Sequence, residues 1–167
     1  MNRDAILQFS IILVLVMPVS AKVIHVPADY PDIRSAVSAS NHGDEIILAD
    51  GIYTGNRNCY IPINESITIR SENGPDNCII DCNDSRPWPI SAFKFRYPVT
   101  LEGLSIINGS TDHGGMGGAI TCEDKLTAIN CVFANNSSLY NGGAIYLRKE
   151  SSASFMNCSL ANNTAAW

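Results

Sequence analysis

The chain repeats itself at a nearly fixed interval, and a repeat of this length constrains the fold before any other feature does. The motif GGAI at residues 117–120 returns 25 residues later at 142–145. The pairs Asn-Cys at 130–131 and Asn-Asn at 135–136 each return 27 residues later. A unit of this size is one supersecondary element that cannot bury its apolar face alone, so the repeat predicts stacked coils.

The residues within each repeat alternate between apolar and polar, which is typical of half-buried strands and does not fit a helix. At the interval of 27 the apolar positions fall into columns that we expect to point inward: Val99/Leu126/Ala153, Leu101/Ala128/Phe155, Leu104/Cys131/Cys158 and Ile106/Phe133/Leu160. Bends are expected at Gly103, Asn130 and Asn157, because glycine and asparagine tolerate left-handed backbone. The pattern therefore predicts an all-β parallel β-helix.

A second face follows from the GGAI motifs. Here Ile120, Cys122, Ile145 and Leu147 are expected inside, with Phe93 and Phe95 in the corresponding places one coil earlier. The register leaves Ala119, Thr121, Ala144 and Tyr146 outside. Stacked asparagines such as Asn136 and Asn163 are expected to hydrogen-bond along the axis.

The N-terminal part of the chain does not follow this repeat. Residues 1–21 combine Arg3, a short apolar run, Pro18 and a small-x-small site ending at Ala21, which predicts a cleaved signal peptide. The alternative is a buried N-terminal helix or an uncleaved anchor. Residues 22–58 are expected to form a cap and the first strands, with an amphipathic helix over 32–40 that covers the first coil. Residues 59–167 are expected to form the coils, truncated at the C-terminus. An open final coil predicts self-association through its unpaired edge.

Six cysteines in an exported chain raise the question of disulfides. Cys122, Cys131 and Cys158 fall on inward positions, so they are expected to be small core residues. Cys131 and Cys158 lie on adjacent coils, where either a disulfide or two free thiols is possible. A zinc site is not expected, because no second metal-binding pair completes Cys78 and Cys82.

The charge of the chain excludes some partners. Its net charge is −5, and its 11 basic residues are scattered, whereas nucleic-acid binding needs clustered cations. No apolar stretch follows the signal segment, so we expect no membrane span after cleavage.

Two segments resemble known families. Residues 24–55 and 67–81 resemble the N-terminal cap and first coil of right-handed parallel β-helices of the pectate-lyase-like superfamily. The GGAI pairs and the Phe-x-x-Asn match at residues 133–136 resemble the repeats of polymorphic outer-membrane proteins; residues 160–163 carry leucine in place of phenylalanine, and the coil before has Ile106 and Gly109. The resemblance implies a fold, whereas its members include lyases, esterases, hydrolases and non-catalytic surface proteins.

The candidate catalytic residues are few. Asp81, Asp84 and Arg86 lie close together in sequence, as a calcium-dependent lyase would require. Asp112, His113, Asp124 and Lys125 form a second group, but neither group matches a lyase motif. The other histidines, His25 and His42, lack a serine or cysteine partner in a recognisable arrangement.

Other candidate residues carry ordinary explanations. Trp88, Tyr97, Tyr140 and Tyr146 suit either sugar stacking or a plain solenoid surface. Several N-x-S/T sequons occur, including Asn64-Glu65-Ser66 and Asn162-Asn163-Thr164; most coincide with bend asparagines.

The expected function is therefore that of a secreted, extracellular or outer-membrane-surface β-helix. It is expected to be non-catalytic and to serve adhesion or contact with polysaccharide or cell-surface glycan. The alternative is a polysaccharide lyase or hydrolase. We expect no cofactor and no metal, with calcium entering only under the lyase alternative.

Overall fold

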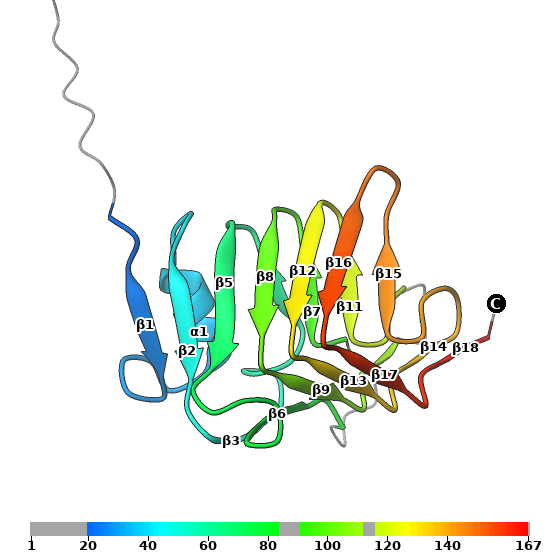
Figure 1. Cartoon of the computed structure of the whole chain (residues 1–167), viewed down its shortest axis with the longest axis horizontal. Coiled ribbons are helices and arrows are strands. Elements are labelled where there is room, and N and C mark those ends of the chain that lie inside the picture. Colours follow the sequence, from blue (N-terminus) through cyan, green and yellow to red (C-terminus); the bar gives the residue numbers. More distant parts are fainter. Residues whose placement is uncertain (1–19, 84–90, 112–115, 167) are drawn as a thin grey trace, which may run out of the picture.

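A computed structural model describes residues 20–83, 91–111 and 116–166 of the chain, so the predicted signal peptide lies outside it except for its last two residues. Short strands alternate among four sheets, which wind around one common core (Figure 1). Sheet A has six strands: β1 (Val23–Val26), β2 (Glu45–Leu48), β5 (Ile67–Ser71), β8 (Val99–Glu102), β12 (Lys125–Ile129) and β16 (Ser152–Met156). Sheet B has five: β3 (Gly51–Thr54), β6 (Cys78–Asp81), β9 (Ser105–Ile107), β13 (Val132–Ala134) and β17 (Ser159–Ala161).

Two smaller sheets close the coil. Sheet C contains β4 (Ile61–Ile63), β7 (Phe93–Phe95), β11 (Ile120–Cys122) and β15 (Ile145–Leu147). Sheet D contains β10 (Ser110–Thr111), β14 (Ser137–Ser138) and β18 (Thr164–Ala165). Strands that follow one another beyond β2 lie in different sheets, and each pairs in parallel with the equivalent strand of the next coil. The chain is therefore a parallel β-helix, as the repeat predicts.

The predicted columns are confirmed by the register. Leu126 lies between Val99 and Ala153, and Phe133 lies between Ile106 and Leu160. In sheet C, Ile120 lies between Phe93 and Ile145. Inward residues of the middle coils are fully buried because a neighbouring coil covers them on both sides.

The predicted orientation of Ala119 and Ala144 is wrong. Both are buried and belong to the core, as is Ala92 one coil earlier. The amide of Ala119 donates to the carbonyl of Ala144, and the amide of Ala92 donates to that of Ala119. These alanines precede the strands of sheet C and stack on one another through backbone hydrogen bonds, so alternation along sheet C does not extend to them.

The tight turn also explains the GGAI motif. Gly117 has φ +79, and a Cβ there would lie 1.9 Å from the carbonyl oxygen of Ile120. A Cβ on Gly118 would lie 2.6 Å from the backbone nitrogen of Ser137. The first glycine therefore supplies left-handed backbone, and the second lets two backbone segments approach closely.

The predicted bends are confirmed at the corner between sheets A and B. Gly103, Asn130 and Asn157 have φ of 64, 50 and 51, the left-handed region that glycine and asparagine tolerate. The Asn136 side chain is fully buried at the corner between sheets B and D. Its Nδ2 donates to Asn163 Oδ1 at 3.0 Å, which confirms the predicted axial hydrogen bond.

The predicted capping helix is α1 (Ile33–Ala39), which begins after Asp32. Asp32 accepts a hydrogen bond from the Ser35 amide, the usual way to satisfy a helix N-terminus. Ile33, Ala36 and Val37 are buried. The helix contacts β1 and β4, the first strands of their sheets, and so covers the end of the core where the stack begins (Figure 1).

The last coil is covered from one side only. Phe155, Met156 and Leu160, which belong to β16 and β17, are all exposed, unlike their equivalents in earlier coils. The strands β15 to β18 lie at the edge of their sheets at this end (Figure 1).

Candidate functional site

Of the first group of candidate catalytic residues, Asp81, Asp84 and Arg86, the structure describes only Asp81. Asp81 ends β6, and its Oδ1 accepts hydrogen bonds from the amide of Asn83 and from Nδ2 of Asn108, both at 2.9 Å. Asp84 and Arg86 lie outside the described residues. Asp81 therefore fixes the bend of the neighbouring coil, and a catalytic role for Asp81, Asp84 and Arg86 stays a prediction.

Of the second group of candidate catalytic residues, the structure describes two of four. Asp112 and His113 lie outside the described residues. Asp124 and Lys125 are exposed at the turn into β12. The Asp124 carbonyl accepts the amide of Ser152 from the next coil, an ordinary ladder hydrogen bond.

A groove that the sequence did not indicate runs along the corner between sheets A and B. We call it the corner groove; its volume is about 600 Å³, and residues of four successive coils line it. The corner is visible where β8 turns into β9 and β12 into β13 (Figure 1). Its lining is Arg70, Ser71, Glu72, Gly74 and Pro75, then Glu102 and Gly103, then Asn130, Cys131 and Val132, then Asn157, Cys158 and Ser159.

Charged side chains stand on the sheet A side of the corner groove. Arg70 lies in register with Glu102 of the next coil, and its Nε donates to Glu45 Oε1 of the previous coil at 2.7 Å. Glu72 lies 4.0 Å from the Nδ1 atom of His25. Arg70 and Glu45 are each about one third exposed, so the pair is screened by water and adds little stability. The guanidinium is therefore positioned at the groove and not buried within the core.

The Asn130 and Asn157 side chains lie along the same groove. Both are exposed, and both sit at bends whose left-handed backbone is shared with Gly103 of the coil before. Equivalent residues of neighbouring coils lie about 4.8 Å apart in a parallel stack. The groove thus offers two amide groups on adjacent coils, one above the other along the axis.

A smaller groove, of about 240 Å³, lies on the outer face of sheet A near the start of its strands. Thr68, Thr100 and Thr127 stand in register there on three successive coils. Their hydroxyls make a polar row on the sheet that also carries Arg70 and Glu102. The outer face of sheet A is therefore hollowed at both ends of its strands.

An ion network lies outside both grooves, on the outer side of sheet C. Glu123 lies 3.1 Å from Lys94 Nζ, 2.9 Å from Arg148 Nη1 and 3.9 Å from Arg96 Nε. Burial alone would raise the pKa of the Glu123 carboxyl, but the hydrogen bond and charge of Lys94 and the charge of Arg148 hold the pKa below its usual value. The carboxylate therefore stays ionised and links neighbouring coils.

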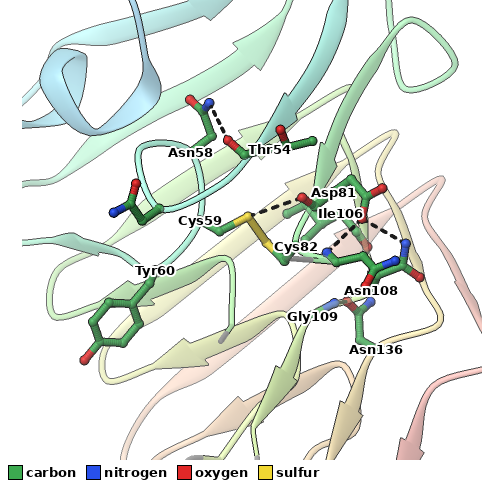
Figure 2. Close-up of a disulfide and its surroundings, with 12 residues drawn as sticks. Thr54, Asn58, Cys59, Tyr60, Asp81, Cys82, Ile106, Asn108, Gly109 and Asn136 are labelled. Carbon is green, nitrogen blue, oxygen red and sulfur yellow. Dashed lines mark hydrogen bonds between the residues drawn. A yellow bond between two sulfur atoms is a disulfide. The ribbon is translucent and has the colours of Figure 1, made fainter. Parts of the chain in front are cut away.

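One disulfide joins Cys59 to Cys82, a pairing that the sequence did not predict (Figure 2). Their Cα atoms lie 5.8 Å apart. The bond connects the segment before β4 to the end of β6, so it links neighbouring coils close to Asn108 and Asn136 (Figure 2).

The remaining cysteines are free thiols, including Cys131 and Cys158, for which a disulfide was one of two expectations. Burial raises the pKa of Cys78 to about 12 and that of Cys131 to about 11. Thiols with such pKa values remain protonated near neutral pH and are poor nucleophiles. These two cysteines act as core residues.

Among residues 20–83, 91–111 and 116–166, no three His, Cys, Asp or Glu side chains gather where they could hold a metal ion. The same ranges contain no helix long and apolar enough to cross a membrane.

Comparison with known proteins finds no match: no protein-family model, no curated protein and no solved structure matches this chain. The fold assignment therefore depends on the strand topology and register described above.

Proposed function

We propose that the protein is an exported, non-catalytic β-helix that contacts neutral glycans outside the cell or at its surface through the corner groove. The observation that carries the proposal is the groove itself, which has a volume of about 600 Å³ and is lined by residues of four successive coils. A linear glycan is an extended ligand with repeating hydroxyls. A groove parallel to the coil axis presents repeating partners at intervals of about 4.8 Å.

The groove has the chemistry that sugar hydroxyls require. Arg70 supplies planar N–H donors, Glu102 supplies acceptors, and the exposed amides of Asn130 and Asn157 supply both. Among the charged groups that line the groove, one cation stands against two carboxylates, Glu72 and Glu102. This balance, with the net charge of −5, favours a neutral glycan over a polyanion.

Export is supported by two independent features. Residues 1–21 carry the pattern of a signal peptide. The Cys59–Cys82 disulfide is of the kind that persists in oxidising compartments outside the cytosol.

The non-catalytic part of the proposal is supported by Asp81. Its carboxylate holds the bend of the next coil through Asn108, as part of the scaffold. The second candidate function, a polysaccharide lyase or hydrolase, depends on the segment that contains Asp84 and Arg86.

The binding test uses an array of immobilised neutral and acidic glycans, followed by calorimetric titration of any ligand found. We expect a neutral glycan to bind and Glu102→Gln or Arg70→Met to weaken it about tenfold or more, because hydrogen bonds to charged groups contribute about 1.5–3 kcal/mol each. Arg148→Met, which removes an exposed cation on sheet C, is the matched control and should leave the affinity unchanged. Binding that ignores both groove variants, or the binding of acidic glycans alone, would contradict the proposal.

The catalytic alternative has its own assay. The purified protein is incubated with polygalacturonate and with methyl-esterified pectin, with and without calcium. We expect no unsaturated products; their formation at an enzyme-dependent rate would favour the lyase.

A further inference from the structure

The chain has sequons at residues 64, 83, 108, 135, 136, 157 and 162, and the sequon that begins at Asn83 extends outside the described residues. All but one of the others fall into two structural classes. Asn108, Asn135 and Asn162 have φ of 57, 56 and 54 at one corner of successive coils, and Asn157 has φ of 51 at another. Asparagine is favoured at such left-handed positions, so the bend explains each of these residues. Asn136 is fully buried, and its amide donates to the carbonyl of Ile106, which leaves no room for an attached sugar.

Asn64 belongs to neither class. It lies between β4 and β5, and its backbone φ is not positive. Because Ile63 is in register with Phe95, and Phe95 with Cys122 and Leu147, the equivalent residues of later coils are Arg96, Glu123 and Arg148. Neither the bend geometry nor the repeat therefore calls for asparagine at this position.

The Asn64 side chain is also accessible. The residue is exposed, and within the described parts of the chain its amide forms no hydrogen bond. Ser66, two residues later, is held by its backbone: its amide donates to His42 Nδ1 at 2.8 Å, and its carbonyl accepts from Gly43. Its hydroxyl has no hydrogen-bond partner among the described residues. The sequon thus forms a short surface turn with both functional side chains free.

We propose that Asn64 is an N-glycosylation site of the exported protein. In the reaction, the Asn64 Nδ2 atom forms a bond to the anomeric carbon of a glycan activated as an anomeric diphosphate. The diphosphate leaves with the electrons of the broken C–O bond, and the amide nitrogen loses one proton. This inference rests on the export part of the proposed function. It does not involve the corner groove, because Asn64 lies where the chain enters sheet A and the groove lies where the chain leaves it.

The test is expression of the full chain in a eukaryotic secretory host, with its own N-terminal segment and, in parallel, with a heterologous leader. Intact mass is measured before and after enzymatic removal of N-glycans, and the modified peptide is located by mass spectrometry. We expect a glycan on the peptide that contains Asn64. Asn64→Gln and Ser66→Ala should remove the glycan from this peptide and lower the intact mass accordingly, and Ser66→Thr should retain it. Asn135→Gly, which keeps the left-handed bend and removes another sequon, is the matched control and should leave the glycan in place.

The failures are distinguishable. Secreted protein that is bare at Asn64, or modified only at other sequons such as those of Asn83, Asn135 or Asn162, overturns the site. Secretion with the heterologous leader but not with the native segment contradicts export and still reports on Asn64. Glycan binding by the Asn64→Gln variant should equal that of the unaltered protein, because the groove is separate.

Discussion

The Asn136 side chain offers the sharpest test of how the corners of this β-helix are stabilised. Its Oδ1 accepts the Gly109 amide at 2.8 Å, and its Nδ2 donates to the Ile106 carbonyl at 3.1 Å (Figure 2). The side chain is fully buried, so Asn136→Ala leaves the Gly109 amide unpaired without access to water and removes the second hydrogen bond of the Ile106 carbonyl, which keeps its ladder bond to β13. An unsatisfied buried group costs about 1–3 kcal/mol and a lost hydrogen bond about 1 kcal/mol, so we expect the variant to lose about 3 kcal/mol of unfolding free energy. Typical domains have only about 5–15 kcal/mol in total.

Urea unfolding followed by circular dichroism measures this loss. The neighbouring variant Asn135→Gly is the control, because residue 135 is exposed and its left-handed φ of 56 suits glycine. It should change the free energy of unfolding by less than about 0.5 kcal/mol. A loss below about 1 kcal/mol in Asn136→Ala, with an unchanged denaturant slope, would refute the reasoning.

A charged replacement at the same position gives a pH signature. In Asn136→Asp, burial raises the pKa of the new carboxyl, and only the protonated form can donate to the Ile106 carbonyl. Because the folded state then binds the proton more tightly than the unfolded state, the deficit should shrink as the pH falls. A deficit that grows on acidification would contradict this picture.

Three further predictions concern other parts of the fold. Replacing Cys59 and Cys82 together by alanine should cost about 3 kcal/mol, since the disulfide closes a loop with a sequence separation of 23, and a reducing agent should destabilise the unaltered protein similarly in thermal unfolding. The pKa of Asp44 is lowered chiefly by the amide of Lys22, so its stabilisation is present above the usual value of 3.8 and is lost as the pH falls further; Asp44→Asn should flatten this part of the acid-unfolding curve. In hydrogen exchange, amides of residues 153–163 should exchange faster than those of 99–107, because the last coil is covered from one side; equal rates in a monomer would contradict this.

Much of the fold could be predicted from the sequence, because its determinants are local or periodic. The alternation of Val99 and Leu101, and their recurrence as Leu126 and Ala128, specifies strands and their register. A shift by one residue would turn every inward side chain outward, so only one register buries the core. Short-range signals in residues 32–40 likewise sufficed for the capping helix.

The corner groove could not be predicted, because the charged part of its lining does not obey the repeat. Arg70 and Glu102 are neighbours in space although 32 residues separate them, whereas later coils recur at 27. Additional residues between β5 and β6 change the spacing: Ile79 follows Ile67 by 12 residues, whereas Ser105 follows Val99, the partner of Ile67, by 6, so a search at the fixed interval does not align the two side chains. The groove depends on the outward contour of four corners, which no single repeat encodes.

The disulfide and the buried alanines of sheet C are two further features that the sequence alone did not predict. Cys59 and Cys82 are not related to each other by the repeat, and the sequence alone is compatible with several pairings of the six cysteines. Alternation assigns Ala119 to solvent, yet it is fully buried and lies between Ala92 and Ala144 of the neighbouring coils. The sequence by itself determined the inward columns, the bends and the helical cap, since each depends on residues at a local or constant spacing. The tertiary structure alone decided the Cys59–Cys82 bond, the buried alanines and the groove, because these depend on how irregular connections bring unequal segments together.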